Sequence, residues 1–499
     1  MRTVIIVERL SPLDAAFLDA EDEDPHASLA IGSVAVLEGP PPSHEEFAAA
    51  IGRRLPLVPR YRQRLRTLPL DLGQPVWVDD AGFDLDYHVR RTALPEPGDD
   101  DALCRLVARL MSQRLDRERP LWETWAVEGL RGGRWAIVSK VHHCLADGVS
   151  GTNLYRALCD APEEEAAAGE DVWVPRPAPS TVRLVAGALG DLARSPVEQL
   201  RLLMWAVQTP ARTVQAVRSV TRGLGTLATA LTPASGSSLS GPIGRPRSYR
   251  LVRASMTDVT HVGKTFGASI NDVALAAISA GFRALLRARG ERPEPHAIRS
   301  LVPVSVRARD DGGVSGNRIS MMLALLPADI DDPVERLRVV HARLATLKAS
   351  KEAEAGAAMT ALAEHEPYPP ISWAIRLAAR LPQRSIVTVT TNVPGPRQPL
   401  FVLGRPILEI FPYVPIALRL RTGVAVLTYC DQIAFGVTSD YTSTPEADLL
   451  AAAIEEGVAE LVAAARSAAS ASSRQKPADS RRARRKAAAG RSEPALPTG

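Results

Sequence analysis

Two adjacent histidines, followed by an aspartate and a glycine, are the residues best suited to chemistry. His142 and His143 end an apolar run, Asp147 lies four residues after His143, and Gly148 follows directly. A free imidazole titrates near pH ~6.5, so a neutral histidine can take a proton from an alcohol at neutral pH. Asp147 could orient the ring or anchor the loop, and Gly148 would permit a sharp turn. A histidine of this motif is therefore a candidate proton acceptor.

Two other interpretations of this motif stay open at this point. The residues could be ordinary polar groups that close a strand. They could also bind a metal ion, but adjacent side chains on a strand point to opposite faces, which makes joint chelation by His142 and His143 awkward. We expect no metal and no cofactor.

The segments around the motif predict an α/β protein. Residues 122–130 and 135–141 flank Gly132-Gly133, which is typical of a β-hairpin. Residues 83–89 alternate between apolar and polar types, which predicts a half-buried strand, and residues 103–115 have helical spacing. Further along, we expect strands at 249–255, 300–306, 318–325, 386–391, 424–429 and 433–437, and helices at 258–266, 271–289, 333–348 and 445–465.

The chain of 499 residues is long enough for two or three domains. We expect an N-terminal half at 1–160, a linker and helical connector at 161–244, a C-terminal half at 245–465 and a basic, disordered tail at 466–499. The tail has nine Lys or Arg against two Asp or Glu, whereas the whole chain has a net charge of only +4. The folded body is therefore slightly acidic, which argues against a nucleic-acid-binding protein.

Cysteine content and hydropathy bear on the compartment. The four cysteines, Cys104, Cys144, Cys159 and Cys430, form no CxxC pair, so neither a zinc ribbon nor a disulfide framework is indicated. No stretch reaches the ~18 apolar residues that a spanning helix needs, and the N-terminus has no signal-peptide core. These features favour a reduced, cytoplasmic setting.

Residues 181–231 combine apolar residues with many arginines. Arginines at 183, 194, 201, 212, 218 and 222 are opposed only by Asp191 and Glu198. Such a stretch could lie in the headgroup region of a membrane or lipid droplet. It could equally be a helical connector that packs across both halves.

Several segments together resemble the bacterial wax ester synthase/diacylglycerol acyltransferase family, part of the CoA-dependent acyltransferase superfamily. The resemblance covers about residues 8–465. The matching segments are LSPLDAAFL at 10–18, FDLDYHVRR at 83–91, Pro120-Leu121-Trp122, His142-His143-x-x-x-Asp147-Gly148, Asn271-Asp272, VPVSVR at 302–307, GN at 316–317 and TNVPGP at 391–396.

The resemblance implies a fold and a reaction. The fold would consist of two chloramphenicol-acetyltransferase-like halves, each a mixed sheet with flanking helices, with an active-site channel between them. The reaction would move a long-chain acyl group from acyl-CoA, the co-substrate, to the hydroxyl of a diacylglycerol or a long-chain alcohol. The products would be triacylglycerol and wax esters. The enzyme could associate peripherally with the inner membrane face or with lipid droplets.

The resemblance also implies roles for single residues. His143 would be the general base, His142 would support it, and Asp147 would hold the loop, with Arg307 as its expected partner. The remaining matches could bind substrate or support the site: Pro120, Leu121, Trp122, Asn271, Asp272, Thr391 and Asn392. Each of these also has a plain structural alternative, as an aromatic core residue, a helix N-cap or a turn.

The chain departs from the family pattern at residues 416–423. The family usually has an acidic, glycine-containing stretch and then an asparagine there, whereas this chain has IALRLRTG. Acyl or acceptor preference could therefore differ, with a polyketide or glycolipid as an alternative acceptor. A non-catalytic lipid-binding protein with the same fold also remains open, although His143 and Asp147 are both present.

Overall fold

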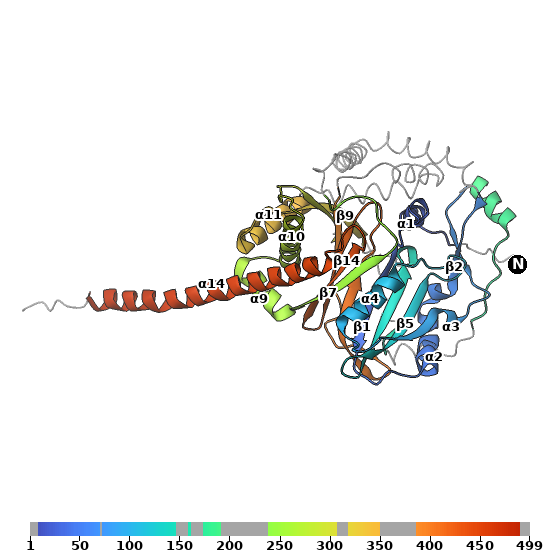
Figure 1. Cartoon of the computed structure of the whole chain (residues 1–499), viewed down its shortest axis with the longest axis horizontal. Helices are drawn as coiled ribbons and strands as arrows, with labels where there is room; N and C mark the ends of the chain where they lie inside the picture. The colour runs from blue at the N-terminus through green and yellow to red at the C-terminus, as the bar shows by residue number, and fades with distance from the viewer. Residues whose placement is uncertain are drawn as a thin grey trace, which may run out of the picture.

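The computed structural model describes residues 8–69, 72–145, 158–160, 173–190, 238–306, 318–349 and 386–489. Two lobes lie side by side, and each is built on a six-stranded sheet (Figure 1). Both sheets contain antiparallel and parallel strand pairs. The predicted α/β fold of two halves with mixed sheets and flanking helices is confirmed.

The N-terminal sheet has the strand order β11-β12-β1-β6-β5-β4. Its strands are β1 (Ala30–Leu37), β4 (Val89–Ala93), β5 (Trp122–Leu130), β6 (Arg134–His142), β11 (Phe401–Val402) and β12 (Arg405–Tyr413). A separate hairpin pairs β2 (Gln63–Arg66) with β3 (Val76–Asp79). The helices of this lobe are α1 (Pro12–Glu23), α2 (His44–Arg54), α3 (Leu85–His88) and α4 (Asp100–Met111).

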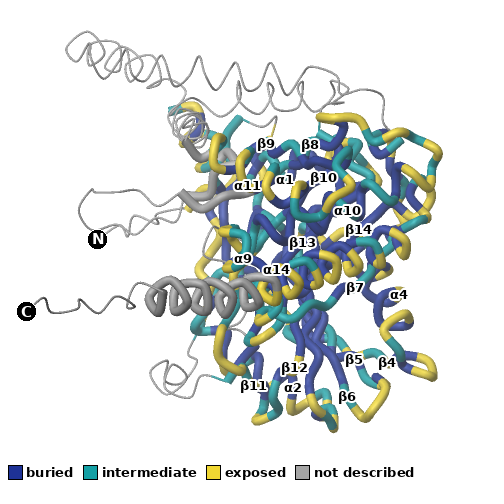
Figure 2. The backbone as a smooth tube through the Cα atoms, turned by 90° about the vertical axis from the view of Figure 1, so that its left-hand side faces the viewer, coloured by how far each residue is buried: buried dark blue, intermediate teal, exposed yellow. Residues whose placement is uncertain are grey.

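The C-terminal sheet has the order β7-β14-β13-β10-β8-β9. Its strands are β7 (Arg247–Ser255), β8 (Ile298–Val306), β9 (Arg318–Leu326), β10 (Thr388–Val393), β13 (Thr422–Tyr429) and β14 (Gln432–Asp440). The helices that pack with it are α9 (Met256–Phe266), α10 (Ile270–Ala288), α11 (Pro333–Ala349) and α14 (Ala447–Ala489). The strands of both sheets are largely buried (Figure 2).

Side-chain caps fix where the helices next to the site begin. The Ser11 hydroxyl accepts the Asp14 backbone N–H at 3.1 Å, and Pro12 occupies the first turn, where its missing N–H costs nothing. At the start of α10, Ser269 and Asp272 form a reciprocal capping box. Both helices are therefore held at their first turns.

One strand joins the lobes. The chain leaves the C-terminal half to form β12, which pairs with β1 in the N-terminal sheet, and then returns to form β13. The Tyr249 hydroxyl on β7 donates to the Pro412 carbonyl of β12 at 2.8 Å. A side chain on Gly436 of β14 would place its Cβ 1.8 Å from the same carbonyl oxygen. The backbone of β12 therefore packs directly against β7 and β14 of the C-terminal sheet.

Most predicted elements are present, but two differ from the prediction, and several elements were not predicted. The strand predicted at 83–89 is wrong: α3 occupies Leu85–His88, because the Asp84 carboxylate caps this short helix at the Asp86 N–H, and only β4 from Val89 onward is extended. Strand β12 was not predicted at all. The helix α14 continues to Ala489, across residues for which the sequence indicated disorder, and its many Ala and Arg residues have high helix propensity.

Residues 146–157, after the histidines, and most of the 181–231 segment lie outside the described residues. Within the described residues, no single helix has the length and apolar composition to cross a membrane. The pair α9 and α10 passes that test only together, with a 100° bend between them.

Candidate active site

Strand β6 delivers the histidines to the end of the N-terminal sheet. It lies between β1 and β5, and eight of its nine residues are buried, so its position is fixed on both sides. The last residue, His142, pairs with Ala30 of β1 and donates its backbone N–H to the Leu121 carbonyl at 2.9 Å. The chain then turns through a short 3₁₀ segment, His143–Leu145.

His142 is fully enclosed and belongs to a polar network. Its Nδ1 accepts the Cys144 backbone N–H at 3.2 Å. Its Nε2 lies 3.6 Å from the Glu21 carboxylate. Glu21 also accepts the Leu29 N–H at 2.8 Å and pairs with Arg117 at 3.0 Å. His142 therefore anchors helix α1 to the strand end.

The Glu21 carboxylate remains charged over the whole physiological range. Burial alone would raise its pKa, but His142, the Leu29 N–H and Arg117 together lower the pKa to about 2. Since the carboxylate is almost fully buried, its charge depends on these partners.

His143 has a different environment. Its backbone N–H donates to the Leu29 carbonyl at 3.1 Å, and its ring stacks on Phe17 with centroids 3.8 Å apart and planes 19° from parallel. Burial, followed by the neighbouring His142, lowers the pKa of His143 to about 4. The ring is therefore neutral at pH 7. Its Nδ1 is enclosed and has no hydrogen-bond partner among the described residues.

The Pro120-Leu121-Trp122 segment lies directly beside the histidines. Leu121 and Trp122 are fully buried, and Trp122 pairs with Val141 across the sheet. The Trp122 indole N–H donates to the Tyr61 carbonyl at 2.8 Å, and the ring stacks on buried His88. This segment supports the strand end through the Leu121 carbonyl and the Trp122 core packing.

The predicted residues of the C-terminal half form a separate cluster. The Asn392 amide at the end of β10 donates to the Asn271 side-chain oxygen at 2.9 Å. Asp272 caps α10 through the Ser269 N–H at 2.8 Å and pairs with His341 at 2.8 Å. Thr391 is half-buried beside Asn392. Asp272 thus serves the helix cap, while the Asn271–Asn392 pair joins α10 to β10.

Three predicted site residues, Asp147, Gly148 and Arg307, lie outside the described residues. Sequence reasoning also missed three residues that the structure places at the histidines: Phe17, Glu21 and Arg117. Phe17 and Glu21 are one helical turn apart, a spacing that puts both on one face of α1. That spacing is visible in the sequence, but it does not say which distant strand the face covers.

The alternative that the histidine motif binds a metal ion can be compared with the described residues. Among the described residues, no group of three or more His, Cys, Asp or Glu side chains could hold a metal ion.

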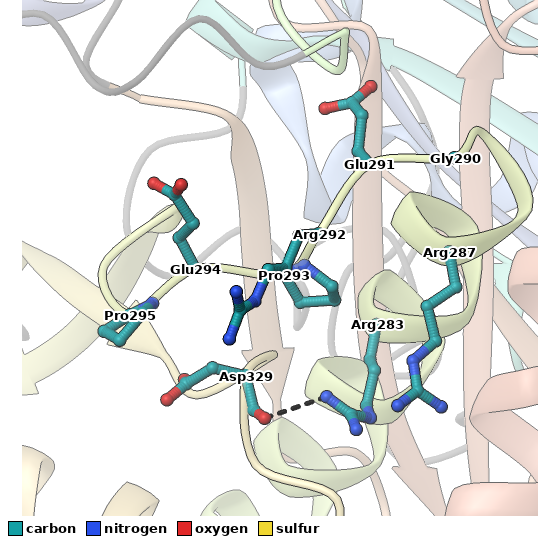
Figure 3. Close-up of a pocket in the computed structure, with 9 residues that line it drawn as sticks. All are labelled: Arg283, Arg287, Gly290, Glu291, Arg292, Pro293, Glu294, Pro295 and Asp329. Carbon is teal, nitrogen blue, oxygen red and sulfur yellow. Dashed lines mark hydrogen bonds between the residues drawn. The ribbon is translucent and has the colours of Figure 1, made fainter.

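A wide hollow of about 1030 Å³ lies where α10 ends, with Arg283, Arg287 and Arg292 around it (Figure 3). The Arg283 guanidinium there already donates to the Asp329 carbonyl at 2.8 Å. None of the predicted site residues lines this hollow.

Comparisons with known proteins identify the family. Residues 10–274 match the "Wax ester synthase/diacylglycerol acyltransferase catalytic domain", and residues 315–462 match the "WS/DGAT C-terminal domain". A protein of Mycobacterium tuberculosis named as a probable diacylglycerol O-acyltransferase is 44% identical over 457 residues, which cover 92% of this chain and 96% of that protein. A second protein of that organism with the same named activity is 38% identical over 455 residues, 91% of each chain.

Solved structures agree with this assignment. The wax ester synthase/diacylglycerol acyltransferase from Marinobacter aquaeolei superposes with a TM-score of 0.61 at 25% identity, covering 92% of this chain and 99% of that one. A starter condensation domain of rhizomide synthetase shares the fold, with a TM-score of 0.53 at 16% identity over 92% of this chain and 94% of that one. The chain belongs to the wax ester synthase/diacylglycerol acyltransferase family.

Proposed function

We propose that the protein is an O-acyltransferase in which His143 is the general base. The acyl group comes from a long-chain acyl-CoA, and the acceptor is the hydroxyl of a diacylglycerol or a long-chain alcohol. The observation that carries the proposal is the half-buried His143 ring directly after β6, which stacks on Phe17 and whose pKa of about 4 leaves it unprotonated at pH 7. Only an unprotonated imidazole can accept the hydroxyl proton.

The chemistry follows from the orientation of this ring. Because Nδ1 is enclosed, we assign the incoming proton to Nε2. The acceptor oxygen attacks the thioester carbonyl as its proton moves to Nε2, which gives a tetrahedral oxyanion. Collapse of this species breaks the carbon–sulfur bond, and the proton on Nε2 goes to the departing CoA thiolate. The ester and free CoA are formed, and the histidine is neutral again.

Asp147, Gly148 and Arg307 complete the proposal as supporting residues. Asp147 holds the loop after the histidines by pairing with Arg307, and Gly148 permits its turn. The proposed channel between the lobes brings acyl-CoA and acceptor to His143. The Asn271–Asn392 pair supports the C-terminal side of that channel. No metal or other cofactor takes part in these steps.

The named activity of the relatives favours diacylglycerol as the acceptor. The segment that departs from the family pattern bears on this choice. Leu418 and Arg419 adopt φ values of 50° and 70°, a region that favours glycine. The preceding Ala417 belongs to the small apolar cluster against which Phe17 packs. We therefore expect residues 416–419 to affect substrate preference.

The test is an acyl-transfer assay with the full-length protein. Palmitoyl-CoA is mixed with diacylglycerol, a long-chain alcohol, a polyketide alcohol or a glycolipid, and free thiol and ester are both measured. We expect ester with the diacylglycerol or the alcohol and loss of activity in His143→Ala. Thermal unfolding confirms that the variant is folded, and His261→Ala, at a half-buried histidine of α9, is the matched control. Full activity in His143→Ala would refute the mechanism, and no ester with any acceptor would refute the function.

We also propose that the protein reaches these lipids at an anionic lipid surface, through helix Thr181–Gly190. Leu184 and Ala188 pack on the β2–β3 hairpin, while Val182 is 80% and Leu189 49% exposed on the outer side. Residues 173–190 contain Arg176 and Arg183 but no Asp or Glu, and Arg176 is paired with Asp79 at 3.0 Å. Exposed apolar side chains beside the exposed Arg183 suit the headgroup region.

Vesicle co-sedimentation tests this second proposal. We expect the wild-type protein to bind vesicles that contain anionic lipid and Val182→Asp/Leu189→Asp to bind several-fold less. Leu449→Asp, at an exposed leucine of α14, is the matched control and should bind normally. Equal binding of all three proteins would favour a simple connector helix instead.

A further inference from the structure

Helix α1 presents one residue to each histidine of the motif. Phe17 stacks on His143, and Glu21, one turn later on the same face, approaches His142. Leu29 links the same groups, because its N–H donates to Glu21 while its carbonyl accepts the His143 N–H. The two histidines are adjacent, yet one faces an apolar ring and the other a carboxylate.

We propose that Phe17 is a positioning residue for His143, which fixes the plane of the imidazole and keeps water from one of its faces. This inference rests on the proposed role of His143 as the base. The close, nearly parallel contact leaves the imidazole little freedom to rotate. Since Nδ1 is enclosed, the direction of Nε2 depends on that ring plane.

The packing behind Phe17 suits this role. Phe17 packs against a small cluster of Ala20, Ala27, Leu29 and Ala417. The first three residues come from α1 and the segment between α1 and β1, but Ala417 follows β12 and belongs to the C-terminal half of the chain. The cluster therefore ties the orientation of Phe17 to both halves, between which the substrates are proposed to meet.

An aromatic ring can act on a histidine in two opposing ways. Its face attracts a cation, which would favour the protonated imidazole. Its bulk removes water, which disfavours the protonated form. For His143 burial dominates, since its pKa is lowered to about 4. Phe17 should therefore help to keep the base neutral.

Other titratable groups near the histidine pair must be considered in any pH experiment. Among the described residues these are His142 and Cys144 on its own segment, Asp14 and Glu21 on α1, and Arg117 beside Glu21. The proposed experiment leaves all of them unchanged. A change in the pH profile of a Phe17 variant therefore reports on the apolar contact.

Two substitutions separate the two effects of Phe17. Phe17→Leu keeps apolar volume but removes the flat face, so we expect kcat to fall roughly 10- to 100-fold with KM within about twofold. Phe17→Ser also admits water, so the pKa of His143 should rise toward 6.5 and activity should drop between pH 7 and 5, where wild-type activity stays level. Phe17→Tyr keeps the ring and should retain most of the wild-type kcat.

Phe83 provides a matched control, because it stacks on another buried histidine, His88, with centroids 5.3 Å apart. Phe83→Leu and Phe83→Ser should leave the pH profile unchanged and kcat within about threefold once folding is confirmed. The inference would be overturned if kcat fell equally in the Phe17 and Phe83 variants. It would also be overturned if the pH profile of activity in Phe17→Ser stayed unchanged or moved to lower pH. If Phe17→Ser does not fold, the ratio of kcat between Phe17→Tyr and Phe17→Leu still decides it. Loss of activity in His143→Ala together with normal Phe17 variants would reject this inference alone.

Discussion

The end of β6 in the N-terminal lobe and the end of β14 in the C-terminal lobe occupy equivalent places in one repeated arrangement. In the order β1-β6-β5-β4, neighbouring strands pair antiparallel, antiparallel and parallel, and β7-β14-β13-β10 repeats this pattern. The registers agree as well: Ala30 pairs with His142, and Arg247 pairs with Asp440, each at the start of one strand and the end of the other. His142 thus corresponds to Asp440, and His143 to Tyr441.

The two strand ends differ in how their polar atoms are satisfied. Asp440 accepts the Gly244 N–H at 2.7 Å and both the N–H and the hydroxyl of Ser443 at 2.8 and 2.7 Å. His143, in contrast, has an enclosed nitrogen without a partner among the described residues and a pKa lowered to about 4. Asp440 is used to close its loop, whereas in the proposed mechanism the His143 Nε2 accepts the hydroxyl proton. Both lobes have the same strand arrangement, and the proposed chemistry depends on the residues at the end of β6.

The largest contrast should appear in the rate. His143→Ala removes the proposed base, so we expect kcat/KM to fall by about 10²- to 10⁴-fold. Tyr441→Ala, at the equivalent place in the other lobe, alters a side chain that is 62% exposed and should leave the rate within about twofold. Thiol release with palmitoyl-CoA and diacylglycerol measures both. Similar losses in the two variants would show that the asymmetry between the lobes is not functional.

The next contrast concerns the middle of the two equivalent strands, where Val138 of β6 corresponds to Gly436 of β14. Gly436→Val would press its Cβ, 1.8 Å from the Pro412 carbonyl, into the crossing strand β12. Because backbone cannot move aside as a flexible side chain can, we expect a loss of about 3 kcal/mol or more in the free energy of unfolding. Urea denaturation measures it. Gly187→Ala, with open space around it, should change stability by less than about 1 kcal/mol.

The sequence predicted the histidine motif at a strand end, the hairpin that carries it and the helix that begins at Asn271-Asp272. These features are local, so neighbouring residues determine them. Strand β12 escaped prediction because Pro406 and Pro412 are unusual in a strand inside a sheet, and only its partner strands reveal it. Phe17 and Glu21 escaped as site residues because α1 meets the histidines across more than a hundred residues of chain, a contact that local patterns do not encode.

A smaller effect is expected from Asp440 itself. Asp440→Ala would leave the Gly244 and Ser443 N–H groups without their acceptor in a partly buried place. Fully buried donors without partners cost roughly 1–3 kcal/mol, and these two are partly buried, so the free energy of unfolding should fall by about 1 kcal/mol. The kcat of the folded fraction should remain close to wild type, because this loop lies in the lobe without the base. A large loss of kcat in fully folded Asp440→Ala would contradict the proposed division between the lobes.

The last expected effect is a pH dependence of stability that arises at the N-terminal strand end. The folded pKa of His143 is lowered from 6.5 to about 4, so the unfolded chain binds this proton first as the pH falls. Stability is therefore complete above about pH 6.5 and decreases toward pH 4, by at most about 1.4 kcal/mol per pH unit. His143→Ala should remove this slope, whereas Tyr441→Ala should keep it. Urea midpoints at half-unit steps from pH 7 to 5 measure the difference. If stability fell equally steeply with pH in wild type and in His143→Ala, the imidazole would be already protonated, or well hydrated, in the folded protein.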